Sequence, residues 1–299
     1  MKYETGLFIY NGTAGSEDME EKLSLTLPVI SKAVKSLTVL QTETLQEARD
    51  AFRHFSDKVE IMIILGGDGT LHECINSIAP LKKRPVIAIL PGGTCNDFSR
   101  MLNMPQELYQ AAKTIVSGEV VNVDLGVATD RYFLNFWGIG LVAETSQKND
   151  REQKKHLGVL SYFMNTLKSL NQTAPFSYKI TADGKEYQDE GVLVLVLNGK
   201  FIGTRQIPIQ TISAYDGKLD ILVVKHSMLA SFRELLTMNI ANNDTNQLNE
   251  LTHFRASTVK IETESKKEID MDGEIDGFTP AEISVLPGHI QMIRNPVWT

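Results

Sequence analysis

A strand-length apolar run that passes directly into a glycine-rich turn constrains the fold of this chain more than any other feature. Residues 61–65 are uninterrupted apolar, Gly66-Gly-Asp-Gly-Thr70 follows at once, and a stretch of helical length begins at Leu71. An apolar strand of this kind is typical of a parallel sheet covered on both faces. A strand, a tight turn and a helix in succession predict a βα unit.

Repetition of this pattern along the first part of the chain predicts an α/β domain. We expect strands at 7–10, 37–40, 61–65, 86–90 and 120–127, alternating with helices at 19–35, 44–55, 71–78 and 106–116. Thr44 and Glu47 form a T-x-x-E capping box at the start of the second helix. Pro28 lies inside the first predicted helix, so a break or kink is expected there.

Beyond residue 128 the sequence changes to β-branched and aromatic runs separated by turn signals, which predicts a second, β-rich domain. We expect strands at 132–136, 176–181, 192–197, 219–224, 254–261 and 282–286, with helical insertions at 157–170 and 228–240. Asp183-Gly184 and Asp216-Gly217 mark turns between these runs.

The Gly66 to Thr70 turn has the chemistry of a phosphate cradle, because backbone N–H groups and a helix N-terminus converge after the strand. Asp68 lies in the middle of this turn. A carboxylate in a phosphate site is unfavourable unless a divalent cation lies between the two anions, so the pattern favours Mg²⁺ with a nucleotide. The alternative is a tight turn in which Asp68 only caps the helix.

A second glycine-rich turn, Pro91-Gly-Gly-Thr-Cys-Asn-Asp-Phe98, follows the next predicted strand. Two adjacent strand ends of a parallel sheet form one crevice at the carboxyl edge, where open α/β sheets bind ligands. Thr94, Asn96 and Asp97 bring a hydroxyl, an amide and a carboxylate to this crevice.

Composition excludes several classes of function. Thirty Lys and Arg against 37 Asp and Glu give a net charge of −7, which argues against nucleic acid as a partner. Only two cysteines occur, without a CxxC pair, and no secretory leader is recognised at the N-terminus, so we expect a cytoplasmic protein. Apolar runs are of strand length, which predicts no membrane span but leaves contact with a membrane surface open.

The two glycine-rich motifs resemble those of the diacylglycerol kinase catalytic-domain family of lipid kinases. GGDGT is shared with NAD kinases, whereas P-x-G-T-x-N-D-F separates the lipid kinases from them. Asn11-Gly-Thr-Ala-Gly15 is similar to the family's nucleotide loop N-P-x-S-G, with Gly12 and Ala14 in place of Pro and Ser. Thr42 matches a threonine that contacts nucleotide, and Asp124 matches an acidic residue near metal and phosphates.

This resemblance implies two domains: a three-layer α/β nucleotide-binding domain at 1–127, with 290–299 as a candidate return to it, and a β-sandwich-like lipid-substrate domain at 128–289. It implies ATP and Mg²⁺ as cofactors. The implied nucleotide-binding residues are Asn11, Thr42, Gly66, Gly67, Asp68, Gly69, Thr70, Gly93, Thr94, Asn96, Asp97 and Asp124.

The resemblance also extends to two motifs in the second half. Asp216-Gly-Lys-Leu-Asp220 is similar to a segment that holds a structural Mg²⁺, which implies the Asp216 side chain and the carbonyls of Ser213 and Lys218 as ligands. The usual preceding Pro and Ala are replaced by Gln and Ile here. Asp272-Gly-Glu274 matches a D-G-E motif, which implies that Glu274 is the catalytic general base, acting with Asp68. The alternative is an exposed turn glutamate.

The sequence therefore predicts an ATP- and Mg²⁺-dependent kinase that phosphorylates a lipid hydroxyl, with diacylglycerol as the expected substrate and phosphatidic acid as the product. Two alternatives stay open: NAD kinase-like phosphorylation of a soluble nucleotide, and a non-catalytic lipid or nucleotide sensor. Residues 148–170 join a basic stretch to an apolar helix. They predict either peripheral contact with the inner membrane face or a solvated loop. The resemblance also suggests a homodimer.

Overall fold

The computed structural model describes residues 2–12, 19–140, 174–225 and 251–296. The chain divides into two compact units. Unit 1 comprises Met1–Val123 and Gly288–Thr299, and unit 2 comprises Asp124–Pro287. No helix in the described ranges is long and apolar enough to cross a membrane.

Unit 1 is built on a parallel sheet, as predicted. Its strands are β1 (Tyr3–Asn11), β2 (Val34–Thr42), β3 (Ile61–Gly66) and β4 (Val86–Pro91), in the order β2-β1-β3-β4. The long strand β18 (Ala281–Arg294) extends the sheet, because its C-terminal part pairs in parallel with β4 at Met292 and Ile87. Five consecutive residues of β3 are buried, as expected for a central strand covered on both faces.

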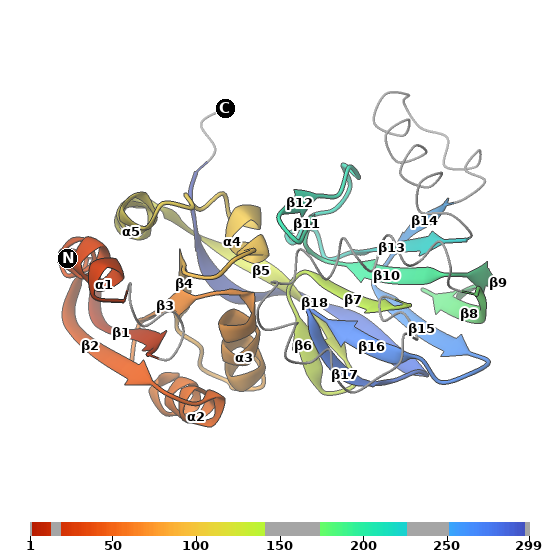
Figure 1. The fold of residues 1–299 in the computed structure, drawn as a ribbon, viewed down its shortest axis with the longest axis horizontal. Coiled ribbons are helices and arrows are strands. Elements are labelled where there is room, and N and C mark those ends of the chain that lie inside the picture. The colour runs from red at the N-terminus through yellow and green to blue at the C-terminus, as the bar shows by residue number, and fades with distance from the viewer. Residues whose placement is uncertain (1, 13–18, 141–173, 226–250, 297–299) are drawn as a thin grey trace. The chain divides into compact units, whose positions relative to one another are not determined.

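Helices cover both faces of this sheet: Figure 1 shows α1 (Met19–Ile30) and α5 (Leu108–Ser117) on one face, and α2 (Leu45–Phe55) and α3 (Asp68–Ile78) on the other. A short fifth helix, α4 (Asp97–Met101), was not predicted. The prediction that the first helix extends to residue 35 is wrong. It ends two residues after Pro28, which lacks an N–H group, and the chain then enters β2.

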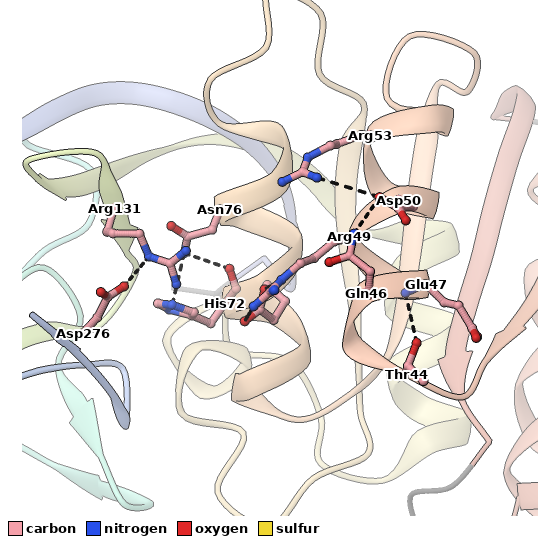
Figure 2. Close-up of polar contacts among 11 residues, drawn as sticks. Thr44, Gln46, Glu47, Arg49, Asp50, Arg53, His72, Asn76, Arg131 and Asp276 are labelled. Atoms are coloured by element: carbon pink, nitrogen blue, oxygen red, sulfur yellow. Dashed lines mark hydrogen bonds and ion pairs between the residues drawn. The ribbon is translucent and has the colours of Figure 1, made fainter.

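Polar contacts fix α2 against α3, whose first residue is Asp68. The predicted cap is present, because the hydroxyl of Thr44 accepts the N–H of Glu47 at 3.2 Å. Arg49 on α2, which is labelled in Figure 2, donates to both carboxylate oxygens of Glu73 on α3, at 2.5 and 2.8 Å. Hydrogen bonding to Glu73 raises the pKa of Arg49. This bidentate pair stabilises the position of the helix that follows the first glycine-rich turn.

Unit 2 is β-rich, as predicted, and contains two larger antiparallel groups of strands. One sheet has the order β14-β13-β10-β7-β16-β17, and the other group pairs β15 with β8 and with the first part of β18, and β8 with β9. The bounds are β7 (Phe136–Ile139), β8 (Phe176–Ala182), β9 (Lys185–Gly191), β10 (Leu193–Leu197), β13 (Leu219–Val224), β14 (Leu251–Ala256), β15 (Thr258–Thr263), β16 (Glu268–Met271) and β17 (Glu274–Phe278).

Three smaller elements complete the described strands. β5 (Glu119–Ala128) crosses the boundary between the units in sequence and pairs with β6 (Arg131–Phe133), while β11 (Phe201–Ile202) pairs with β12 (Arg205–Gln206). The single strand predicted at 254–261 is wrong, since β14 and β15 belong to different sheets and separate at Ser257. The strand predicted at 132–136 likewise divides into β6 and β7. The helices predicted at 157–170 and 228–240 lie outside the described residues.

The core of unit 2 lies between its two sheets. Buried side chains from β7, β10, β13 and β16 pack with those of β8, β15 and β18; Trp137, Val196 and Ile261 are members of this cluster. The alternating burial along β8 is typical of a strand with one face on a core. By contrast every residue of β10 is buried, because Leu195 and its neighbours on the opposite face join a second apolar cluster. Unit 2 is therefore a β-sandwich with an additional apolar layer.

Asp183 anchors the hairpin between β8 and β9. Asp183 and Gly184 both have positive φ, 45° and 83°, as a two-residue hairpin turn requires. The Asp183 carboxylate accepts the N–H groups of Ser257 at 3.0 Å and of Thr258 at 2.9 Å. Partial burial raises the pKa of Asp183. Hydrogen bonds from these N–H groups, from Lys218 and from the Thr258 hydroxyl lower the pKa by more than burial raises it, to about 2.

Replacement of this carboxylate is expected to have a pH-dependent effect on stability. Because the pKa is lower in the folded state, the stabilisation is complete above about pH 4 and is lost as the pH falls towards 2. Asp183→Asn should lower the free energy of unfolding by about 1 kcal/mol or less at neutral pH, since the site is partly exposed and screened. Urea unfolding of both proteins at pH 7 and near pH 2 measures this, and an equal difference at both pH values would contradict it.

Candidate functional site

The predicted nucleotide-binding residues of unit 1 are brought to one edge of its sheet. The strand register pairs Asn11 with Thr42 and Gly66 with Pro91, and Tyr10 with Leu65, so β1 to β4 end side by side. This is the carboxyl edge, where open parallel sheets bind ligands.

The two glycine-rich turns meet at this edge. A Cβ atom added to Gly93 would lie 2.5 Å from the Cα of Gly67, and one added to Gly67 would lie 3.0 Å from the Cα of Gly93. The N–H of Gly92 also donates to the carbonyl of Gly66 at 2.9 Å. Backbone approaches this close are open only to glycine, so the two turns form one continuous surface lined by main-chain atoms.

The start of α3 provides an anion-compatible N-terminus beside these turns. Gly67 is its N-cap and supplies no side-chain acceptor for the first N–H groups. Asp68 is half-buried, and its Oδ1 accepts the N–H of Phe98 at 3.3 Å, which links the first turn to α4. Gly69 is exposed and Thr70 is half-buried. A Cβ atom added to Gly66 would lie 2.9 Å from the Cβ of Thr70.

Within the second turn, Asn96 holds the loop in shape. Its backbone is left-handed, with φ 53°, and its side chain accepts the N–H of Gly93 at 2.9 Å and donates to the carbonyl of Gly93 at 2.8 Å. The amide therefore braces the turn. Asp97 is buried at the first position of α4, and Thr94 is exposed.

At the ends of β1 and β2, Thr42 is buried and its hydroxyl donates to the carbonyl of Tyr10 at 3.3 Å. The N–H of Gly12 donates to the carbonyl of Thr42 at 2.9 Å. Thr42 thus fixes the ends of two strands at the site edge. Asn11 is half-buried at the end of β1, and the rest of its loop, 13–18, lies outside the described residues.

In unit 2 the D-G-E motif forms a tight hairpin. Asp272 and Gly273 both have positive φ, 54° and 95°, and Met271 pairs with Glu274 across the turn. Glu274 is exposed at the first position of β17, so its carboxylate is open to a reacting group.

Asp272 is a positioning residue for this hairpin, a role that sequence reasoning did not assign. Its Oδ1 accepts the N–H groups of Asn135 and Phe136, at 2.8 and 3.0 Å, and its Oδ2 accepts that of Leu134 at 2.8 Å. The turn that presents Glu274 is therefore fastened to residues 134–136.

Asn198 is a second functional candidate that sequence reasoning missed. It is completely buried, and its side-chain amide donates to the carbonyls of Asp124 at 3.0 Å and Leu134 at 2.7 Å. It therefore joins the strand that carries Asp124 to the segment that holds Asp272. The available signal was a polar residue directly after the apolar run 192–197.

Asp124 and the candidate metal segment lie together in unit 2. The Asp124 side chain is buried and accepts the N–H of Gly217 at 2.7 Å, while its own N–H donates to the carbonyl of Ala214 at 2.8 Å. Asp216 accepts the N–H of Lys218 at 3.1 Å and pairs with Arg255 at 2.5 Å. These contacts bring Asp124 to the segment that contains Ser213, Asp216 and Lys218.

The oxygen donors at the candidate sites are of the kind that Mg²⁺ prefers: carboxylates of Asp68, Asp97 and Asp216 and main-chain carbonyls. The donor types therefore fit this metal. At Asp216 the guanidinium of Arg255 competes for the same carboxylate. Within the ranges that the structure describes, no three His, Cys, Asp or Glu side chains are grouped to hold a metal ion.

Comparison with known proteins places this geometry in a family. The family described as "Diacylglycerol kinase catalytic domain" matches residues 5–128. The family described as "YegS C-terminal NAD kinase beta sandwich-like domain" matches residues 138–294. The chain belongs to the diacylglycerol kinase family of lipid kinases.

Individual relatives match this lipid kinase in sequence over nearly its whole length. A protein from Staphylococcus aureus (strain Newman) named "Putative lipid kinase" is 29% identical over 98% of this chain and 97% of its own. Two crystal structures of Bacillus anthracis str. Sterne proteins, named "a putative diacylglycerol kinase" and "a diacylglycerol kinases", are each 42% identical. They cover 99% of this chain and 99% and 98% of their own, with TM-scores of 0.88 and 0.86. The predicted fold class, an α/β domain followed by a β-sandwich-like domain, is confirmed.

Proposed function

We propose that this lipid kinase transfers the γ-phosphoryl group of ATP, with Mg²⁺, to the hydroxyl of diacylglycerol and produces phosphatidic acid. The observation that supports this best is the close approach of the two glycine-rich turns at Asp68. It creates a main-chain surface beside a helix N-terminus, with a carboxylate for a metal ion. A triphosphate is suited to such a surface because N–H groups and Mg²⁺ together neutralise its charge.

In this proposal the nucleotide is bound along the carboxyl edge of the unit 1 sheet. Gly66, Gly67, Gly69, Thr70 and Gly93 supply backbone contacts, and Asn11, Thr42, Thr94 and Asn96 form and line the surrounding turns. Asp68, Asp97 and Asp124 are the acidic residues proposed to act with Mg²⁺. When bound, Mg²⁺ would neutralise charge that develops on the phosphates.

Glu274 is the proposed catalytic base. As the lipid oxygen forms its bond to the γ-phosphorus, the bond from that phosphorus to the β-phosphate oxygen breaks and ADP leaves. The hydroxyl proton goes to the Glu274 carboxylate and then to solvent. An exposed carboxylate at the first position of a strand, on a turn braced by Asp272, suits this role because it is accessible and yet fixed in direction.

We also propose a structural Mg²⁺ at Asp216 and the carbonyls of Ser213 and Lys218. Since Asp216 is paired with Arg255, this metal would have to displace the guanidinium from the carboxylate. Action on a membrane lipid further suggests a cytoplasmic protein that contacts the inner membrane face peripherally, and a homodimer is proposed from family resemblance. The segment 148–170, for which the sequence predicts either membrane contact or a solvated loop, lies outside the described residues.

The test is transfer of labelled phosphate from ATP to a panel of acceptors in mixed micelles: diacylglycerol, other lipid alcohols and, in buffer, NAD. We expect diacylglycerol to be labelled and the label to disappear when Mg²⁺ is chelated. Labelling of NAD alone would support the NAD kinase-like alternative. If no acceptor is labelled while the folded protein binds lipid or nucleotide, the chain is a sensor and the proposal is wrong.

A further inference from the structure

Unit 1 contains a polar cavity whose lining includes none of the candidate site residues. Its volume is about 480 Å³, which lies in the range of small-molecule sites. The residues that line it include Lys82, Lys83, Arg84, His289, Gln291 and Asp57.

The cavity lies at the edge of the sheet opposite to the glycine-rich turns. Val59, in its lining, precedes β3, and Arg84 precedes β4, whereas Gly66 and Pro91 end the same two strands. At about 3.3 Å per residue, a six-residue strand separates the two edges by roughly 15–20 Å. A ligand in this cavity would therefore not compete for the nucleotide surface.

Positive charge gathers at this cavity in a chain whose net charge is −7. The lining contains three basic residues, Lys82, Lys83 and Arg84, and a single carboxylate, that of Asp57. Lys82 and Lys83 are exposed, and neither has an ion pair or side-chain hydrogen bond with any residue that the structure describes.

Arg84 is fixed in place without a carboxylate partner. Its Nε donates to the carbonyl of His289 at 3.1 Å, and its Nη1 donates to the carbonyls of Ala79, at 3.4 Å, and Leu81. His289 Nε2 also donates to the carbonyl of Ala79, at 2.9 Å. Main-chain carbonyls orient this guanidinium but leave its charge unneutralised, as in a preorganised anion site.

The geometry points to a second ligand site in which Lys82, Lys83 and Arg84 bind the phosphate of a phosphomonoester. An oriented guanidinium and two flexible ammonium groups are suited to a dianionic phosphate. The cavity is larger than one phosphate group, and Asp57 and Gln291 offer hydrogen-bonding partners to a polar, hydroxyl-bearing remainder. Such a group is available either in a small soluble molecule or in a lipid headgroup at a membrane.

The experiment uses the full chain and two probes at constant ionic strength. Calorimetric titration with glycerol 3-phosphate tests the soluble source. Co-sedimentation with phosphatidylcholine vesicles that contain or lack phosphatidic acid tests the lipid source. In whichever arm binds, Lys82→Gln combined with Lys83→Gln should weaken affinity about tenfold or more. Asp68→Asn should leave this binding unchanged, so failure of the proposed kinase activity would not affect the result.

A matched control removes the same charge elsewhere in unit 1. Lys32 and Lys113 are exposed and do not line the cavity, so Lys32→Gln combined with Lys113→Gln should bind like the wild type. If the Lys82/Lys83 variant loses affinity for only one of the two probes, glycerol 3-phosphate or phosphatidic acid vesicles, that probe identifies the source of the phosphate group. The proposal is overturned if neither probe binds, if the Lys82/Lys83 variant binds as tightly as the wild type, or if the control loses as much affinity as that variant.

Discussion

Glu274→Gln is expected to lower kcat for lipid phosphorylation by roughly 10²–10⁴-fold, the usual contribution of a general base. Glutamine has nearly the same shape but cannot accept the proton of the attacking hydroxyl. Glu274 is exposed and starts a strand, and the turn before it is held by Asp272, so its replacement should leave the fold intact. Initial rates with diacylglycerol in mixed micelles, together with a thermal unfolding curve, measure both effects.

Glu268 provides the matched control for this variant. It is an exposed glutamate on β16, the partner strand of the same hairpin, and it pairs with Phe278 at the far end from the turn. Glu268→Gln should retain wild-type kcat. The role of Glu274 is refuted if Glu274→Gln keeps full activity, or if both variants lose activity to the same extent.

The sequence predicted those parts of the site that depend on residues close together in the chain. Gly66 to Thr70 follows an apolar strand and precedes a helix, so a turn lined by main-chain atoms at a sheet edge could be predicted from residue types alone. The capping residue Thr44 and the turn at Asp183 are equally local, since cap and turn preferences involve only a few successive residues.

What the sequence could not provide are contacts between residues far apart in the chain. The approach of Gly67 to Gly93 depends on the register of β3 with β4, and the binding of Asp272 to residues 134–136 spans more than 130 positions. Asn198 illustrates the same limit: an amide after an apolar run is visible, but its acceptors depend on sheet pairing. The split of the strand predicted at 254–261 also follows from packing, because its two halves join different sheets.

Asp272→Ala is expected to lower the free energy of unfolding by about 2–4 kcal/mol and to lower kcat by at least tenfold in the folded protein. Three N–H groups, of Leu134, Asn135 and Phe136, lose their acceptor, and each unsatisfied donor costs about 1–3 kcal/mol when buried. Alanine also tolerates the positive φ of 54° less well than aspartate does. The turn that presents Glu274 then loses its anchor.

Asp272→Asn separates positioning from stability, because asparagine keeps one acceptor oxygen and tolerates positive φ. We expect Asp272→Asn to have a higher free energy of unfolding and a higher kcat than Asp272→Ala. Asp183→Ala is the matched control: Asp183 occupies an equivalent Asp-Gly turn with backbone N–H partners, in the hairpin of β8 and β9. It should destabilise unit 2 but leave kcat of the folded protein near wild type. Equal loss of kcat in Asp183→Ala and Asp272→Ala would show that Asp272 acts only through stability. That result would contradict the inference that the Asp272 carboxylate positions Glu274.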